Sequence, residues 1–160
     1  DIRLGKLPDS DLVVRKLLSM QPELYAAPML LERYSEPKHP KDLETFPCIN
    51  FSHNAGSWAL TKGKQNITVR PNSVHTVNTS ALSLDFALAG LGAAWLIAPL
   101  AARFTQDGQI VKILHGWAPP GGVDLSLVMA GRRLPRRVRL LVDHLVEHFG
   151  ELSAGMKSGT

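Results

Sequence analysis

The chain has 160 residues, which is enough for one domain with a sizeable core or for two small lobes. With 44% apolar residues, 20% charged residues and a mean hydropathy of -0.01, its composition is that of a globular protein, and its apolar runs are too short to cross a bilayer. The net charge of +4 includes five arginines within residues 132–139. We expect these arginines to mark the solvated start of a helix, with a surface for an anion or a partner as the alternative.

In the first half of the chain, short apolar runs separated by turn residues predict mostly strands. Pro28 stands where a helix can begin, so residues 29–34 are predicted to be helical, and a single helical turn is predicted at residues 40–43. The strands of this half are predicted at residues 2–4, 12–18, 23–27, 48–51, 58–61, 67–70 and 73–77. The pair around the polar turn 62–65 is expected to be a hairpin.

The second half alternates helices with strands. Residues 78–89 carry two apolar stripes at helical spacing, which predicts a helix covered on both sides. The last helix begins at Pro135 with core spacing as far as Phe149, and residues 150–160 are expected to be a flexible tail. The other elements are strands at 93–97, 109–114 and 123–130 and a short helix at 100–104. The alternation indicates an α/β fold, in which the turn-rich segment 118–122 separates a middle lobe from the final strand and helix.

The segment Gly90-Leu91-Gly92 resembles part of a nucleotide-binding loop, but its context does not fit one. Such a loop runs from a strand through glycines into a helix, so that the helix N-terminus faces the phosphate. Here the glycines follow a helix and precede a strand, and Trp95 stands where the third glycine would be. We therefore expect Gly90 to be the left-handed residue that ends the helix.

The opposite end of the same helix is the better candidate for a site. The residues Thr76-Val77-Asn78-Thr79-Ser80 lead from a strand into the helix and bring hydroxyl groups and free N–H groups to its positive end. In an open α/β sheet, ligands bind at such strand-to-helix turns. Simple capping by Asn78 or Thr79 is the alternative.

Other chemical motifs are weak. His144-Leu145-Val146-Glu147-His148 matches the inverted zinc-protease pattern, but no distant third ligand follows, so we expect no metal there. The single cysteine, Cys48, excludes a disulfide within the chain and is expected to be a free core thiol in a reducing compartment. The sequence contains no G-x-S-x-G motif and no phosphate-binding loop, and Trp58, Trp95 and Trp117 are expected to be core anchors.

Several segments together resemble the effector-binding domain of LysR-type transcriptional regulators. They are IRLGKLPDS at residues 2–10, LYAAPMLLERY at residues 24–34, Pro40-x-Asp42-Leu43, and residues 78–114 with GLGAA at 90–94 and the Asp107-Gly108 turn. No single segment is specific, but their order and spacing from Ile2 to Phe149 are.

The resemblance implies an α/β fold with two lobes, like that of periplasmic binding proteins of type 2. Residues 1–22 would be part of lobe I, residues 23–122 lobe II, and residues 123–149 the return to lobe I. Members of this family carry a winged helix-turn-helix, a linker helix and two β-α units ahead of the position that matches Ile2. The sequence is therefore expected to be a fragment whose first lobe is incomplete.

The resemblance also implies a site and a set of partners. A small effector, expected to be anionic, would contact Thr76, Asn78, Thr79 and Ser80 from the middle lobe, and Arg3 and Gly5 from the other. The regulator would need no cofactor, catalyse no reaction, form a homo-oligomer (dimer or tetramer), avoid membranes, and act in the cytoplasm. It would bind DNA only through the helix-turn-helix domain. The rival interpretations are a solute-binding protein of a transport system and an enzyme on an α/β scaffold.

Overall fold

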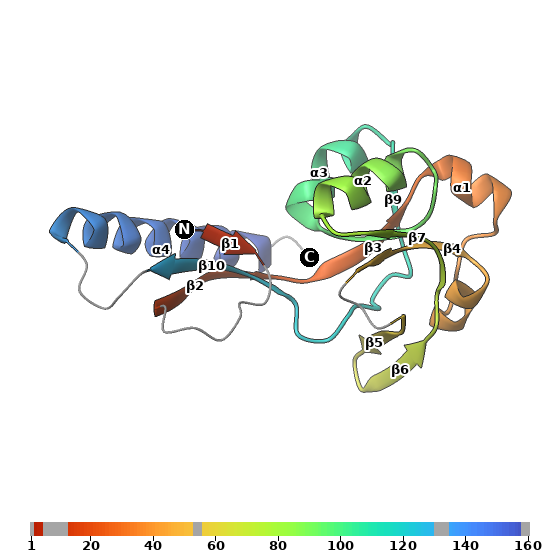
Figure 1. Cartoon of the computed structure of the whole chain (residues 1–160), viewed down its shortest axis with the longest axis horizontal. Coiled ribbons are helices and arrows are strands. Elements are labelled where there is room, and N and C mark those ends of the chain that lie inside the picture. The colour runs from red at the N-terminus through yellow and green to blue at the C-terminus, as the bar shows by residue number, and fades with distance from the viewer. Residues whose placement is uncertain (1, 5–12, 53–55, 130–134, 158–160) are drawn as a thin grey trace. The chain divides into compact units, whose positions relative to one another are not determined.

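The structure, a computed structural model, describes residues 2–4, 13–52, 56–129 and 135–157. The chain divides into two compact units (Figure 1). Unit 1 contains residues 1–20 and 122–160, and unit 2 contains residues 21–121. No described helix is long and apolar enough to cross a membrane.

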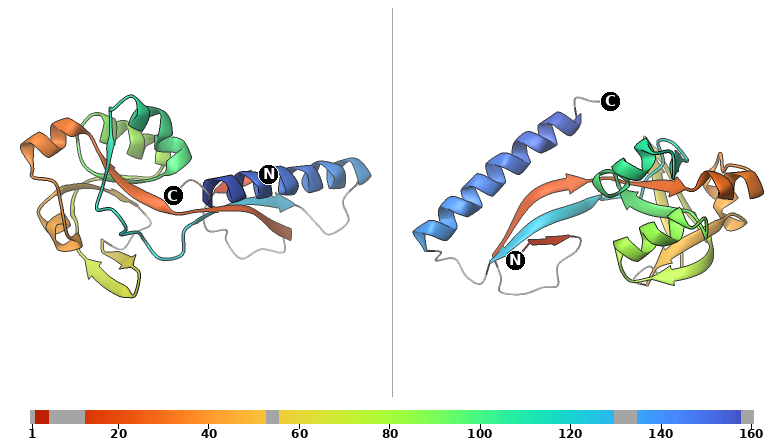
Figure 2. Two further views of the ribbon diagram at one scale, coloured as in Figure 1. Left: turned by 180° about the vertical axis from the view of Figure 1, so that it is seen from behind. Right: turned by 90° about the horizontal axis from the view of Figure 1, so that it is seen from above.

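Unit 1 is a three-stranded antiparallel sheet with one helix. The strands β1 (Ile2–Leu4), β10 (Val123–Met129) and β2 (Val13–Met20) lie in the order β1-β10-β2. The helix α4 (Arg136–Lys157) lies along β2 (Figure 2) and contributes Val142 to a small core with Leu17 and Leu127. Residues 150–157, which were expected to belong to a flexible tail, continue this helix, because they include good helix formers such as Leu152, Ala154 and Lys157.

Unit 2 is built on one mixed sheet. The antiparallel group has the order β8-β3-β9, with β8 (Ala94–Ile97), β3 (Pro22–Ala26) and β9 (Val111–Ile113). The strand β4 (Pro47–Phe51) pairs in parallel with β7 (Asn72–Val77). A parallel bridge between Cys48 and Ala93 joins the two groups, with N···O distances of 2.8 Å from Ile49 N to Ala93 O and 2.9 Å from Ala93 N to Pro47 O.

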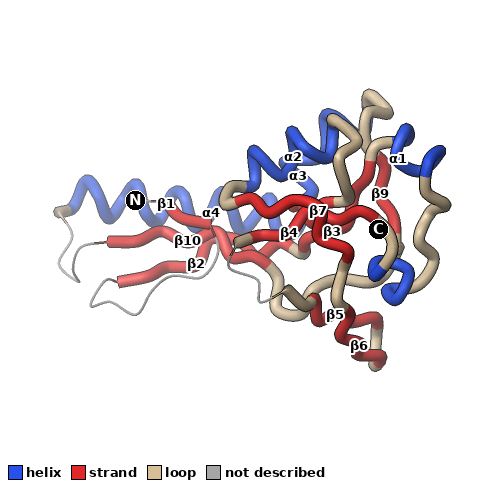
Figure 3. Tube along the Cα trace, turned by 45° about the vertical axis from the view of Figure 1, so that its right-hand side comes forward, coloured by secondary structure: helices blue, strands red, loops and turns tan. Residues whose placement is uncertain are grey.

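Both faces of this sheet are covered. The helices α2 (Ser80–Leu88) and α3 (Ala98–Gln106) lie together on one side of the strands (Figure 3), over a core that includes Ile49, Val77 and Leu96. The opposite face carries the hairpin of β5 (Trp58–Lys62) and β6 (Gln65–Val69), the helix α1 (Pro28–Arg33) and the 3-10 turn η1 (Pro40–Glu44). This second core buries Trp58 and Trp117, and the partly buried Trp95 packs against it, so all three tryptophans are core anchors as predicted.

Most predicted elements are confirmed within two to three residues. One expectation about unit 2 was wrong. The helix α2 is covered on one side only, since its buried residues are Ser83, Leu84 and Ala87 while Leu82 is exposed. In unit 1, the strand β10 is the central strand of its sheet, a position that the sequence did not predict. Strand order in an antiparallel sheet depends on long-range pairing, which local patterns do not encode.

Candidate functional site

The N-terminus of α2 lies at the edge of the unit 2 sheet where parallel strands end. The strands β7 and β4 run in the same direction, with Val77 opposite Phe51, so the residues that follow them meet at one edge. The N–H group of Ser52 donates to the carbonyl of Val77 at 2.8 Å, which places Ser52 beside the chain that enters the helix. The carboxyl edge of parallel strands is the usual ligand-binding edge of α/β proteins.

Thr79 caps this helix. Its backbone is extended, with φ of -134° and ψ of 148°, and its hydroxyl oxygen accepts a hydrogen bond from Leu82 N at 3.2 Å. Asn78 is exposed and Ser80 half-buried. The first-turn N–H groups of a helix have no acceptor within the helix, and no acidic side chain stands in the first turn of α2. The cap interpretation is therefore right for Thr79, while the positive end of the helix remains available to an anion.

The structure does not bring all six predicted effector-site residues together. Thr76, Asn78, Thr79 and Ser80 are consecutive or nearly so at the end of β7, and Thr76 is exposed opposite Asn50. Arg3 lies in β1 of unit 1, opposite Ser126, and Gly5 lies outside the described residues. Four of the six therefore share one edge of unit 2.

Ser52 belongs to this edge and was not predicted from the sequence. It directly follows the predicted strand 48–51, just as Asn78 directly follows the strand 73–77. The sequence thus placed both residues directly after a strand, but only the parallel pairing of β4 with β7 shows that the two positions are adjacent.

A second polar cluster, on β3 and β9, is satisfied internally. Glu23 accepts hydrogen bonds from Tyr25 Oη at 2.7 Å and from Lys112 Nζ. Burial raises the pKa of the Glu23 carboxyl, but the bonds from Lys112 and Tyr25 outweigh it, so the pKa ends below its usual value. Burial and the Glu23 carboxylate together raise the pKa of Tyr25. The cluster forms a closed hydrogen-bonded set that joins the two strands.

The Gly-Leu-Gly segment ends α2, as predicted. Gly90 has φ of +69°, and the bonds from Leu91 N to Phe86 O and from Gly90 N to Ala87 O, each 3.0 Å, form the usual left-handed helix end. A side chain at Gly90 would also meet Met29 Cγ at 2.8 Å. This glycine is therefore required by the backbone and by packing.

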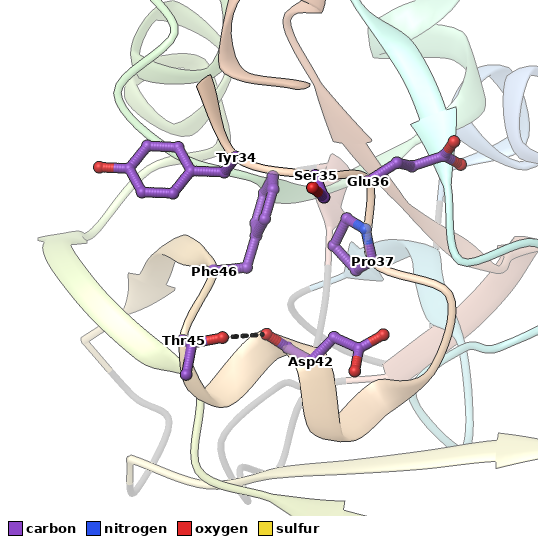
Figure 4. Close-up of a pocket in the computed structure, with 7 residues that line it drawn as sticks. All are labelled: Tyr34, Ser35, Glu36, Pro37, Asp42, Thr45 and Phe46. Atoms are coloured by element: carbon purple, nitrogen blue, oxygen red, sulfur yellow. Dashed lines mark hydrogen bonds between the residues drawn. The ribbon is translucent and has the colours of Figure 1, made fainter. Parts of the chain in front are cut away.

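A surface pocket of about 360 Å³ lies elsewhere in unit 2, between the end of α1 and η1 (Figure 4). Its lining comprises Tyr34, Ser35, Glu36, Pro37, Asp42, Thr45 and Phe46. Its carboxylates already have partners. Asp42 accepts from His39 N at 2.8 Å and Lys38 N at 2.9 Å, and these bonds hold the pKa of the Asp42 carboxyl below its usual value. Glu36 pairs with Lys38. None of the predicted site residues lines this pocket.

The remaining sequence candidates are surface or core features. His144 and His148 lie one turn apart on the exposed side of α4, with stacked rings 6.3 Å apart. Among the described residues, no group of three or more His, Cys, Asp or Glu side chains is placed to hold a metal. Arg136, Arg137 and Arg139 are exposed, as expected for a solvated helix start. Cys48 is a free buried thiol, as predicted, and burial raises its pKa to about 12.

The fold and the edge site together define a class, the α/β sensor and binding domains built like periplasmic binding proteins. The family described as the LysR substrate binding domain matches residues 2–150, so the chain belongs to this family. It is 36% identical over 152 residues to an HTH-type transcriptional regulator of Xanthomonas campestris pv. campestris, covering 91% of this chain and 44% of that protein. It is 31% identical to a putative transcriptional regulator of Pseudomonas aeruginosa, covering 90% of this chain and 49% of that protein.

Solved structures agree on the fold. The CrgA regulatory domain of Neisseria meningitidis, a LysR-type regulator, superimposes with a TM-score of 0.76 at 22% identity, covering 93% of this chain and 75% of that chain. Full-length AphB of Vibrio cholerae gives 0.75 at 22% identity, covering 91% of this chain and 50% of that chain. The chain spans about half the length of the curated relatives it matches. These relatives are transcriptional regulators and not enzymes, in agreement with the prediction that the chain is not an enzyme.

Proposed function

We propose that this chain is the effector-sensing part of a bacterial transcriptional regulator, and that a small anionic molecule binds at the N-terminus of α2. The observation that carries the proposal is a capped, acid-free helix N-terminus at the carboxyl edge of parallel strands, in a chain of the LysR family. Thr76, Asn78, Thr79, Ser80 and, from unit 1, Arg3 and Gly5 are the proposed contacts. The names of the relatives support a regulator over a transport protein.

The energies fit a selective but reversible sensor. A negative group at a helix N-terminus gains about 0.3–1 kcal/mol, and one charge-assisted hydrogen bond from a first-turn hydroxyl or N–H adds roughly 1.5–3 kcal/mol. Together these contributions correspond to about one to three powers of ten in affinity. An effector that contacts both units favours one arrangement of them and thereby shifts the population that the oligomer presents to DNA.

The proposal extends to the whole regulator. DNA is bound through a helix-turn-helix domain outside this chain, the regulator is a homo-oligomer (dimer or tetramer), and it works in the cytoplasm. The titles of two neighbours support the regulator part of this extension, since AphB is described as a virulence activator and CrgA as a LysR-type transcriptional regulator.

The test is effector binding by the full-length regulator with Thr79→Ala and Ser80→Ala together. A panel of small carboxylic acids, scored by the rise in melting temperature, first supplies a ligand. The double variant should then bind that ligand about ten- to a hundredfold more weakly, which is the share of the hydroxyl hydrogen bond, while DNA binding is retained. An unchanged affinity would mean that these residues only cap the helix.

Loss of the cap itself must be separated from loss of ligand contacts. Asp42→Ala is the matched control, because it removes a capping side chain of similar strength from η1 in the same unit. It should lower stability as Thr79→Ala does and leave the affinity for the acid unchanged. Thr79→Ser keeps a hydroxyl at the cap and should restore most of the binding.

A further inference from the structure

The pocket between the end of α1 and η1 lies within unit 2 and contains none of the residues of the α2 site. Its volume of about 360 Å³ is in the range of sites for small organic molecules. Asp42 and Thr45, from η1 and its C-terminal end, lie on one side of it, and the segment from Tyr34 to Pro37 lies on the other (Figure 4). The pocket is therefore a second place in unit 2 where a ligand of limited size fits.

The backbone on both sides of the pocket is fixed before any ligand binds. The N–H groups of Lys38 and His39 donate to the Asp42 carboxylate at 2.9 Å and 2.8 Å, which ties the loop after α1 to the first turn of η1. Pro37 is buried and restricts its own φ. A ligand does not have to order this loop, so its binding costs less conformational entropy.

Two aromatic rings form much of the apolar lining. Phe46 is 3% exposed, whereas Tyr34 is 40% exposed. Their ring centroids lie 6.0 Å apart in an edge-to-face arrangement, with 69° between the ring planes, so the buried Phe46 ring supports the Tyr34 ring. The faces of aromatic rings carry partial negative charge and attract cations. The accessible ring of Tyr34 therefore favours a ligand with a positive charge.

The charged side chains of the pocket favour the same kind of ligand. Glu36 and Asp42 are acidic, and none of the lining residues that the structure describes is basic. Glu36 is already paired with Lys38 Nζ at 2.6 Å. Asp42 is different, because both of its hydrogen bonds come from neutral backbone N–H groups and both end on Oδ2. Within the described part of the chain, no lysine or arginine side chain pairs with Asp42, and its Oδ1 accepts no hydrogen bond.

Asp42 keeps its negative charge at neutral pH. The N–H groups of His39 and Lys38 hold the pKa of the Asp42 carboxyl below its usual value. Because the cap of η1 uses Oδ2, a ligand can donate a charge-assisted hydrogen bond to Oδ1 while the cap stays in place. Asp42 would repel an anion, and it would stabilise a neutral ligand less than a cation.

We propose that this pocket binds a small organic cation, in which an ammonium, amidinium or guanidinium group is attached to a compact apolar body. The cationic group bonds to Asp42 Oδ1, and the apolar body packs against Tyr34, Phe46 and Pro37. The site does not rest on the proposed function of the chain, and it prefers the opposite charge to the α2 site. Unit 2 therefore has two separate binding sites for ligands of opposite sign.

The test is a titration of the isotope-labelled 160-residue chain with benzamidinium, a planar cation with an aromatic body, followed by the NMR signals of the backbone amides. NMR detects binding even when the affinity is low. The amide signals of residues 34–46 should shift until they saturate, and those of residues 76–82 at the α2 site should not shift. Benzyl alcohol, which has a similar body without the charge, and benzoate, which has the opposite charge, should cause no saturable shift in residues 34–46.

Two variants test the charge and the ring separately. Asp42→Asn keeps an oxygen for the two backbone N–H groups but removes the charge, and it should weaken benzamidinium binding about three- to tenfold. Tyr34→Leu keeps an apolar side chain but removes the ring, and it should weaken binding about two- to fivefold. The matched control is Asp85→Asn, which removes an exposed carboxylate from α2 in the same unit and should leave the affinity unchanged.

Three results would overturn the proposal. The first is an equal loss of affinity in Asp85→Asn or an equal shift with benzyl alcohol, since either shows unspecific binding to the surface. The second is an unchanged affinity in both Asp42→Asn and Tyr34→Leu. The third is a shift of the signals of residues 34–46 when the chain is diluted without benzamidinium, because a side chain of a second copy would then occupy the pocket. None of these results depends on Thr79 or Ser80, so the cation site and the α2 site can fail separately.

Discussion

The two units bury their apolar residues to different extents. In unit 2 the sheet is covered on both faces, with Leu60 fully buried on one and Leu96 nearly so on the other. In unit 1 the described residues form one small core under α4, while Leu140 and Leu141 are 62% and 56% exposed and Val14 is 46% exposed. Unit 2 thus has the larger core, although single apolar side chains such as Met29 and Val74 are exposed on it. Unit 1 presents the adjacent pair Leu140 and Leu141, both more exposed than Met29, as apolar surface of the kind that marks an interaction site.

The largest difference should appear in stability. Leu60→Ala, in the core of unit 2, should lower the free energy of unfolding by about 2–5 kcal/mol, since it removes buried methyl groups and leaves a cavity. Leu140→Ala on α4 should change it by about 0.5 kcal/mol or less. Urea denaturation followed by far-ultraviolet circular dichroism measures both. Equal losses would contradict the comparison.

The exposed surface of unit 1 should drive self-association. We expect the 160-residue chain to sediment as more than a monomer at high concentration in analytical ultracentrifugation. Leu140→Glu with Leu141→Glu should weaken association about tenfold or more, because burial of each leucine contributes about 1.5–3 kcal/mol. A clean monomer at all concentrations would contradict the expectation. As a control, Leu82→Glu, on the exposed side of α2 in unit 2, should leave the association constant unchanged.

A smaller difference concerns two aspartates. Asp42 in unit 2 is held by two backbone N–H groups, and Asp42→Ala should cost about 1 kcal/mol. Asp124 in unit 1 is partly exposed and is held by the side chains of Lys16 and Ser19 only, so Asp124→Ala should cost less. Thermal unfolding at pH 7 compares the two variants directly. Equal costs would show that the backbone bonds of Asp42 add nothing.

The carboxyls of Asp42 and Asp124 should also make the stability of the chain depend on pH. Hydrogen bonds hold the pKa of each carboxyl below its usual value in the folded chain. The stability that each carboxylate adds is therefore fully present above the carboxyl's pKa in the unfolded chain, and it is lost as the pH falls through the lower pKa of the folded chain. The Asp42→Ala variant and the unchanged chain should therefore converge in melting temperature in acid, below about pH 4. Curves that stay parallel into acid would contradict this sign.

The smallest effect is expected from removal of metal, which should not change the melting temperature. His144 and His148 lie on the exposed side of α4 without a third ligand among the described residues. Treatment with a strong chelator should therefore leave the melting temperature unchanged. A clear drop would show that unit 1 holds a metal and that its core depends on it.

Element types could be predicted because apolar spacing and turn residues act locally. Gly90 and Pro28 are examples, since one ends a helix and the other begins one, as predicted. The central place of β10 could not be predicted, because it depends on pairing between residues more than 100 positions apart. For the site, Thr79 was identified from its neighbours, whereas Ser52 required knowing that β4 and β7 are parallel.

The buried thiol of Cys48 can report how often unit 2 opens. Its sulfur lies near the carbonyls of Phe46 and Leu43 at 3.2 Å and 3.9 Å, at the bridge that joins the two halves of the sheet. A thiol reagent reaches such a group only when the sheet opens, and the high pKa of about 12 keeps it in the unreactive thiol form until then. The rate at which a thiol reagent modifies Cys48 therefore measures the opening of unit 2 separately from that of unit 1, and no engineered probe is needed.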